Sequence, residues 1–126
     1  MPHLPFGPMI NSMFITDEDK NEPIMVCKKE DTGISVNLHI QYINFMPGQH
    51  KFSVSVTDKD GKEYLNGSPN TFNFPNSNIE PKFKYSIAEV IMYIIMTKEE
   101  VENLTYITIH VKIDDELEGT NVLFLE

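Results

Sequence analysis

The sequence predicts an all-β protein, an antiparallel β-sandwich of about seven to nine strands. The most informative segment is 42–61, in which Phe52, Val54 and Val56 alternate with polar residues between a turn at Pro47-Gly48 and a turn at Asp60-Gly61. Side chains on a strand point to opposite faces in turn, so this pattern indicates one buried face and one solvated face. Similar segments recur at short intervals, bounded by Gly, Pro, Asn and Asp, which is typical of a sandwich or barrel.

The length and charge limit the domain count and the partners. A chain of 126 residues is expected to form one domain over residues 1–126, with residues 1–8 as an extended N-terminal arm. The net charge of −9 argues against nucleic acids and anionic membranes, because both are bound through Lys and Arg.

Cysteine content and hydropathy bear on the cellular compartment. The single cysteine, Cys27, excludes an intrachain disulfide, which is compatible with a reducing compartment. The start of the chain has no signal-peptide pattern. The longest apolar run, 90–96, covers seven residues, whereas a membrane helix needs about 20. We therefore expect a cytoplasmic protein.

Several segments show the alternation of a half-buried strand. In chain order they are residues 9–16, 24–28, 34–42, 51–58, 62–65, 107–113 and 122–125. The segment 24–28 is short and is expected at a sheet edge. Asp60 and Gly61 suit a tight hairpin, because glycine tolerates positive φ and aspartate caps its own turn. Phe72 and Phe74 are expected to attach a short strand or loop to the core, and a loop is expected over 114–120.

The segment 83–97 fits two structures. Its isoleucines and valine fit helical spacing, and Ser86 with Glu89 makes a capping box. Ile, Val and Tyr nevertheless favour strands, and the first residues alternate apolar with polar. We favour a long strand, followed by one short helical turn within 97–103, which begins with a second capping box.

The run Glu-Glu-Val-Glu-Asn-Leu-Thr-Tyr-Ile-Thr-Ile-His-Val at 99–111 resembles part of an immunoglobulin-like sandwich. In that family an acidic helical turn leads into the penultimate strand, whose early tyrosine hydrogen-bonds back to the corner. The resemblance gives this role to Tyr106. The block 47–61, with turn glycines Gly48 and Gly61, is similar to a pattern of bacterial immunoglobulin-like modules.

The chain as a whole thus looks like a small bacterial or phage immunoglobulin-like protein. It departs from antibody domains because it has no tryptophan and no cysteine pair. The resemblance implies an immunoglobulin-like topology and says nothing of an immune or adhesive role.

Acidic turns are the first candidate metal site. Residues 58–61 are similar to the core of a calcium loop, but an EF-hand needs carboxylates where this chain has Val56 and Gly67. A hairpin turn is the simpler interpretation. Several loops at one end of the sandwich could instead bind calcium through Asp17, Glu18, Asp19, Asp58, Asp60, Asp114, Asp115 and Glu116.

The remaining candidates are histidines and the cysteine. His39 and His110 lie on polar faces of predicted strands and would share a metal ion if those strands were neighbours, although plain surface histidines are the simpler interpretation. His3 and His50 lie in or beside turns and indicate no specific site. Cys27 lies in an apolar run, which favours a buried inert thiol, while the two lysines that follow could lower its pKa.

The apolar stripe of Met92, Tyr93 and Met96 belongs either to the core or to a homodimer interface. The sequence contains no phosphate-binding loop, nucleophile elbow, zinc-ligand cysteine pair or Rossmann fingerprint, and we expect no cofactor. We predict a non-enzymatic interaction or structural module that acts through loops or an exposed edge.

Two other functions stay open at this point. The first is a calcium- or carbohydrate-binding module that uses the acidic loops with Tyr or Phe platforms. The second is an enzyme, which would need a pocket that joins His39, His110 and carboxylates.

Overall fold

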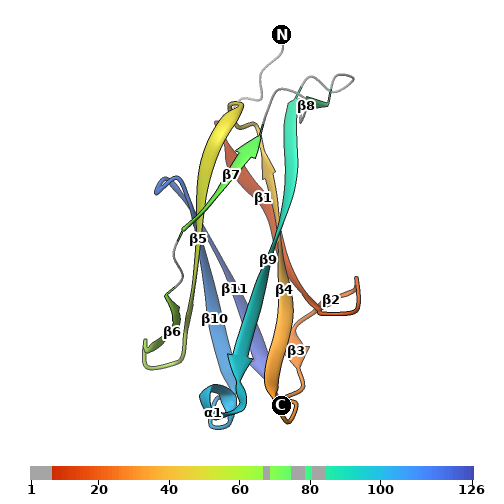
Figure 1. Cartoon of the computed structure of the whole chain (residues 1–126), viewed down its shortest axis with the longest axis vertical. Helices are drawn as coiled ribbons and strands as arrows, with labels where there is room; N and C mark the ends of the chain where they lie inside the picture. The colour runs from red at the N-terminus through yellow and green to blue at the C-terminus, as the bar shows by residue number, and fades with distance from the viewer. Residues whose placement is uncertain (1–6, 67–68, 75–78, 81–84) are drawn as a thin grey trace.

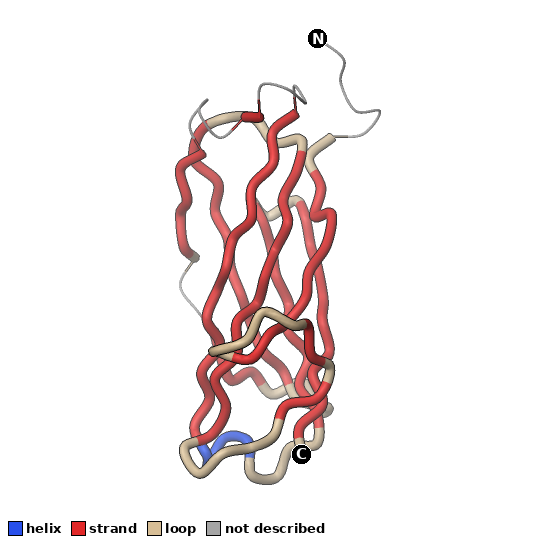
Figure 2. Tube along the Cα trace, turned by 90° about the vertical axis from the view of Figure 1, so that its right-hand side faces the viewer, coloured by secondary structure: helices blue, strands red, loops and turns tan. Residues whose placement is uncertain are grey.

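Two β-sheets pack face to face, with their strands along the long axis of the molecule (Figure 1, Figure 2). The computed structural model describes residues 7–66, 69–74, 79–80 and 85–126. Within these residues the chain forms eleven strands and one short helix. Eight of these strands contain four or more residues, in agreement with the prediction, and three contain only two. The predicted all-β sandwich is confirmed.

The first sheet has five strands, and all of its neighbouring strands are antiparallel. Their order is β2 (Pro23–Ile24), β1 (Met9–Asp17), β4 (Gly33–Ile43), β9 (Tyr85–Thr97) and β8 (Ile79–Glu80). Strands β4 and β9 pair without interruption from Ile43 opposite Ile87 to Gly33 opposite Thr97.

The second sheet has six strands. Their order is β3 (Val26–Cys27), β11 (Leu117–Leu125), β10 (Tyr106–Ile113), β5 (Gly48–Thr57) and β6 (Glu63–Asn66), and β7 (Asn70–Phe74) also pairs with β5. All pairs are antiparallel except β3 with β11, which is parallel. No helix among the described residues is long and apolar enough to cross a membrane.

The segment 24–28 lies at a sheet edge as predicted, but it is not one strand. The chain passes from the first sheet to the second at Met25, so β2 lies at the edge of one sheet and β3 at the edge of the other. The carbonyl oxygen of Met25 accepts a hydrogen bond from the backbone of Phe124, which holds the crossing against β11 (2.9 Å).

The segment 85–97 is a strand, and the helical interpretation is wrong. The expected capping residues have other partners, because Ser86 donates to the carbonyl oxygen of Phe45 and Glu89 contacts His39. The short helix α1 (Lys98–Val101) follows, and Thr97 with Glu100 forms the predicted capping box. Residues 81–84 lie outside the described residues.

The core consists of the inward-facing residues of both sheets, and it includes a cluster of aromatic rings. Tyr42 is 1% exposed, and its ring centroid lies 4.6 Å from that of Phe45 and 5.7 Å from that of Phe52. Phe72 and Phe74 join this cluster from β7, so the predicted attachment of this segment to the core is confirmed.

The turns are close to the prediction, with one difference. Gly48 and Gly61 have φ values of +127° and +81°, which L-residues rarely adopt. The loop expected over 114–120 is shorter, because β11 already begins at Leu117. Asp114 and Asp115 both have positive φ, as in the tight hairpin turns that match strand twist. Of the predicted N-terminal arm, residues 1–6 lie outside the described residues, and β1 begins at Met9.

Candidate interaction surface

Strand β9 is apolar on both faces. Its even-numbered residues from Ala88 to Met96 enter the core and are at most 9% exposed. The odd-numbered residues face outward, and the apolar ones are Ile87 (41% exposed), Ile91 (44%), Tyr93 (73%) and Ile95 (65%). The stripe predicted from the sequence is therefore divided between two surfaces, because Met92 and Met96 lie in the core and Tyr93 does not. We call the four outward residues the β9 face.

One long edge of β9 is open in the described part of the chain. On one side β4 pairs with residues 87–97, whereas on the other side β8 pairs only with Tyr85 and Ser86 within the described residues. The carbonyl oxygen of Ser86 points to the β4 side, where it accepts from the backbone of Asn44 (2.9 Å). Because backbone groups alternate along a strand, the odd-numbered residues from Ile87 onward direct their N–H and C=O groups to the open edge.

This edge lacks the usual protection against strand pairing. Natural edge strands are commonly interrupted by prolines, bulges or several charges. Residues 87–97 contain no proline, their register with β4 is continuous, and Glu89 is their only charged residue. The Glu89 carboxylate lies 2.9 Å from Nδ1 of His39 on β4. The edge is therefore suited to accept another strand.

A groove runs beside this edge, between the two sheets. It has a volume of about 470 Å³ and is lined mostly by apolar side chains, namely Val54, Leu65, Phe72, Ile91, Met92 and Tyr93. The opposite side of the sandwich is closed, because β1 contacts β11 there and the Asn121 amide donates to the carbonyl oxygen of Met13 (3.4 Å). Among the residues that the structure describes, the sandwich is thus open at β9.

His39 lies on the outer face of the first sheet, but it is not a plain surface residue. It is 9% exposed, because the Phe14 ring stacks on it with centroids 4.6 Å apart. Its Nε2 lies 2.9 Å from the Thr16 hydroxyl, and its Nδ1 contacts Glu89. These contacts connect β1, β4 and β9, so His39 has a packing role beside the β9 face.

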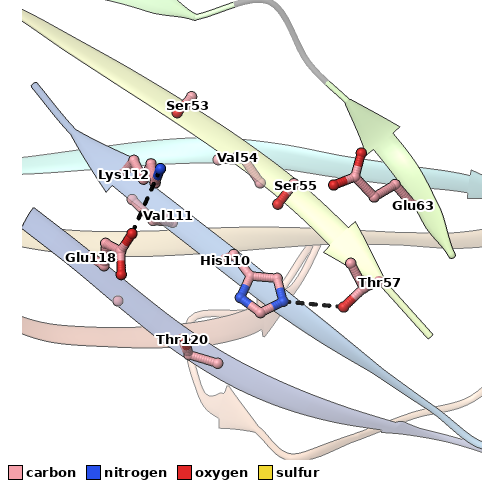
Figure 3. A pocket seen from close by; sticks show the side chains of 11 residues that line it. Ser53, Val54, Ser55, Thr57, Glu63, His110, Val111, Lys112, Glu118 and Thr120 are labelled. Atoms are coloured by element: carbon pink, nitrogen blue, oxygen red, sulfur yellow. Dashed lines mark hydrogen bonds and ion pairs between the residues drawn. The ribbon is translucent and has the colours of Figure 1, made fainter. Parts of the chain in front are cut away.

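His110 lies in the other sheet, so the two histidines cannot share a metal ion. The outer faces that carry them point away from each other across the core. His110 lines a depression of about 430 Å³ on β5, β6, β10 and β11. Its Nε2 lies 3.1 Å from the Thr57 hydroxyl (Figure 3). The residues that line this depression are polar or aliphatic, and it therefore gives no aromatic platform for a carbohydrate.

The acidic turns do not gather at one end of the sandwich. Asp58 and Asp60 follow β5, whereas Asp114, Asp115 and Glu116 follow β10. These strands are antiparallel neighbours, so the two turns lie at opposite ends of the sheet (Figure 1). Among the described residues, no group of three or more His, Cys, Asp or Glu side chains could hold a metal ion. The expected gathering of these loops is therefore wrong.

The carboxylates of these turns have local partners. Asp58 accepts hydrogen bonds from the backbone of Asp60 and Lys62 and from the Tyr64 hydroxyl. Desolvation acts to raise the pKa of Asp58, but these three bonds outweigh it and hold the pKa below its ordinary value. The segment 58–61 is therefore a hairpin turn stabilised by its own aspartate.

The two hairpin aspartates after β10 bind the neighbouring strand β5. Asp115 forms an ion pair with Lys51 (2.8 Å). One oxygen of Asp114 accepts from the Lys51 backbone (2.7 Å), and the other lies 2.5 Å from Nδ1 of His50. Nε2 of His50 lies 2.6 Å from the carbonyl oxygen of Met46. Both partners of the imidazole are acceptors, so both ring nitrogens are satisfied when both carry a proton.

Opposing influences act on the pKa of His50. Burial acts to lower it, but the bonds to Asp114 and Met46 and the charge of Asp114 outweigh burial, so the pKa lies above its ordinary value. The Tyr42 hydroxyl lies 3.4 Å from Nδ1 of His50. Burial and the charges of Asp114 and Glu116 raise the pKa of Tyr42 to about 12, so this phenol stays neutral.

Replacing His50 with glutamine is expected to remove a pH-dependent stabilisation. A group with a raised folded pKa contributes fully below its unfolded value, about 6.5 for histidine, and this contribution disappears as the pH rises through the folded pKa. The free energy of unfolding of the wild type should exceed that of His50→Gln by about 1.5–3 kcal/mol near pH 5.5, and by less near pH 8.5. Urea unfolding at both pH values measures the difference. A difference in unfolding free energy that stays constant or grows as the pH rises would contradict the raised pKa of His50.

The structure does not support a reactive Cys27. The thiol is 5% exposed, and burial, followed by the charges of Asp17 and Glu30, raises its pKa above the ordinary value. The lower thiol pKa that Lys28 and Lys29 could cause is therefore not found. The inert buried thiol is the better interpretation.

Tyr106 begins β10, but no contact among the described residues supports the tyrosine-corner role. The inward residue at this point is Ile107, so the Tyr106 side chain lies on the outer face and packs near Phe124, with ring centroids 6.3 Å apart. Within the described residues its hydroxyl makes no hydrogen bond. Tyr106, Phe124 and Val122 (44% exposed) form a second, smaller apolar area on the outer face of the second sheet.

Sequence reasoning missed the His50–Asp114 pair and the contacts of His39. Both depend on residues that are 64 and 50 positions apart along the chain. The role of His50 could have been inferred only from the pairing of β5 with β10. This pairing brings Phe52 opposite Ile113, and hence His50 beside the turn that follows β10. The β9 face was partly visible in the sequence as an excess of apolar residues. No protein-family model and no curated protein matches this sequence.

Proposed function

We propose that this protein is a non-enzymatic interaction module that binds an extended segment of a partner along the open edge of β9. The observation that carries this proposal is the combination of the edge along residues 87–97, which no strand of the described residues covers, with the exposed β9 face. In such binding the backbone of the partner pairs with the edge, and alternate side chains of the partner give specificity.

The strand order supports an immunoglobulin-like topology for the module. In that topology four strands, A, B, E and D, form one sheet, and G, F, C and C′ form the other. The orders β1-β4-β9-β8 and β11-β10-β5-β6 correspond to these. Strand β8, in the D position, pairs with only two residues of β9. The partner segment would take the place of a longer D strand.

The chemistry of the site indicates the kind of partner. The β9 face favours a partner with apolar residues at alternate positions, because apolar cross-strand pairs stabilise a sheet. The net charge of −9 favours a neutral or basic segment over an acidic one and disfavours nucleic acid. A single buried thiol suits a reducing compartment, so we place the module in the cytoplasm of a bacterium or phage-infected cell.

Peptide selection tests this function directly. Extended peptides selected from a random library for binding should protect the backbone amides of Ile91 and Tyr93 from hydrogen exchange. The variant Ile91→Lys should bind the selected peptides at least about tenfold more weakly, because it places a charge among apolar pairs. Val122→Lys is the matched control, since Val122 has the same 44% exposure on the other sheet. Equal losses in both variants, or peptides that leave the β9 amides unprotected, would contradict the proposal.

A further inference from the structure

The β9 edge is complementary to itself. In an antiparallel pair of identical strands, a residue at the centre lies opposite its own copy, and the residues on either side exchange places. With Ile91 at the centre, Ile87 lies opposite Ile95 of the second copy, and Glu89 lies opposite Tyr93 of the second copy. Every outward isoleucine then meets an isoleucine, and each carboxylate meets a phenol that can donate a hydrogen bond to it.

We infer that β9 pairs with β9 of a second copy of this chain, antiparallel and centred on Ile91, so that the two sheets join into one. Met96 and Thr97 of the second copy then take the place of the two-residue strand β8 beside Ser86 and Tyr85. This inference rests on the proposed function, because it uses the same open edge. The centred residue belongs to the odd-numbered set whose N–H and C=O groups point to that edge. The paired positions 87, 89, 91, 93 and 95 are therefore those at which the two strands exchange hydrogen bonds.

Neighbouring registers are less complementary. If the centre moves to position 92, Glu89 lies opposite Ile95, and if it moves to 90, Glu89 lies opposite Ile91. Both shifts place the Glu89 carboxylate opposite an isoleucine, which cannot donate a hydrogen bond to it as Tyr93 can. When the centre moves by one residue, each residue of one strand moves by two positions relative to the other strand. The outward side chains therefore stay on the outer face in every register. The choice among registers thus depends on which side chains lie opposite each other.

Charge also favours this surface for self-association. A chain of net charge −9 repels its own copy, and this repulsion is weakest where carboxylates are fewest. The β9 edge has Glu89 as its only charged residue between 87 and 97. In the centred register the two Glu89 residues are offset by four residues, about 13 Å along the strand, which exceeds the Debye length of about 8 Å at physiological salt.

The groove beside β9 gives a further reason for an added strand. Val54, Leu65 and Phe72 are only partly buried, because no strand covers the mouth of this groove in the described part of the single chain. A second β9 would run along this mouth and cover part of that apolar surface. The open side of each sandwich would then be closed, as β1 and β11 already close the other side.

Sedimentation over a range of concentrations tests the dimer. The mass should rise from 14.5 kDa to twice this value, with a dissociation constant on the order of 1–100 µM for a small interface. Ile91→Lys and Ile91→Glu should each weaken the dimer at least about tenfold, because each places like charges at the centre. An equimolar mixture of these two variants should regain a dimer, since the charges then have opposite signs. Val122→Lys should dimerise as wild type does.

Cross-linking with a short bis-maleimide tests the register. Ile91→Cys should couple to itself, while Ile87→Cys and Ile95→Cys should couple only when mixed. In the centred register, position 87 of one copy lies about 27 Å from position 87 of the other. Wild type is the control, because its one cysteine, Cys27, is buried. Coupling of Ile87→Cys to itself would overturn the register.

Residue-resolved hydrogen exchange tests the mode of pairing. The amides of Ile91, Tyr93 and Ile95 should become protected as the dimer forms, whereas those of Val90 and Met92 should be protected at all concentrations through β4. A dimer in which the amides of Ile91, Tyr93 and Ile95 gain no protection would be packed face to face and would overturn the inference. A protein that stays monomeric at millimolar concentration would also overturn it. If the selected peptides still bound β9 in that case, only the second copy would be excluded and the proposed function would stand.

Discussion

Replacement of Gly33 by alanine is expected to destabilise the protein by at least about 3 kcal/mol, because it combines backbone strain with a steric clash. Gly33 has φ of +115°, a region that only glycine adopts readily. A Cβ atom at this position would lie 1.9 Å from the carbonyl oxygen of Met96 and 2.7 Å from the carbonyl carbon of Thr97. Both are backbone atoms of β9, so the clash cannot be relieved by a side-chain rotation.

Gly61→Ala separates the two causes. Gly61 also has positive φ, +81°, but a Cβ atom there would have no heavy atom within 4 Å. Its substitution should cost only the strain of the turn, about 1–2 kcal/mol. Urea unfolding of both variants gives the comparison. If Gly33→Ala were no more destabilising than Gly61→Ala, the close approach of β4 to the end of β9 would be refuted.

Replacement of Tyr42 by alanine is expected to cost about 3–5 kcal/mol, as is typical when a buried aromatic ring is removed. Tyr42 is 1% exposed, and its ring contacts those of Phe45, Phe52 and His50. These residues come from β4, the following loop and β5, so the ring joins the two sheets near one end. Its removal would leave a cavity that rigid aromatic neighbours cannot fill.

Two further tyrosine variants test this account by urea unfolding. Tyr42→Phe keeps the ring and loses only the hydroxyl near His50, so we expect a cost of about 0.5–1.5 kcal/mol. Tyr93→Ala removes a ring that is 73% exposed, and it should change the stability of the monomer by less than about 0.5 kcal/mol. A large loss in Tyr93→Ala would mean that the β9 face is covered within the single chain, against the proposed function.

The strands could be predicted where one face is apolar and the other polar. The alternation over 34–42 and 107–113 is a local property of the chain, and these segments became β4 and β10 with ends shifted by one residue. The capping box at Thr97 is also local, and α1 begins there. The strand ends could not be predicted as well, because the hydrogen bonds of the neighbouring strands determine them.

The segment that carries the candidate site was the hardest to predict. Strand β9 is apolar on both faces, so its alternation is hidden and helical spacing fits it nearly as well. An apolar strand on both faces usually lies at the centre of a sheet. Its position at an edge results from the shortness of β8, a property of the assembled sheet that no residue of β9 indicates.

The acidic turns show a similar limit. The sequence correctly indicated turns with Asp58, Asp60, Asp114 and Asp115, but it could not place them at an end of the sandwich. Because β5 and β10 are antiparallel neighbours, their turns are separated by the length of the sheet. The same pairing brought Asp114 to His50, where sequence reasoning expected no site.

The sequence by itself determined the class of fold, since side-chain alternation and turn chemistry act between residues close together in the chain. Strand order, and with it the open edge of β9 and the contacts of His39 and His50, was decided only by the tertiary structure. Pairing between distant strands depends on which apolar faces can be buried together, and many pairings satisfy the same local pattern. Only the assembled sandwich selects one of them.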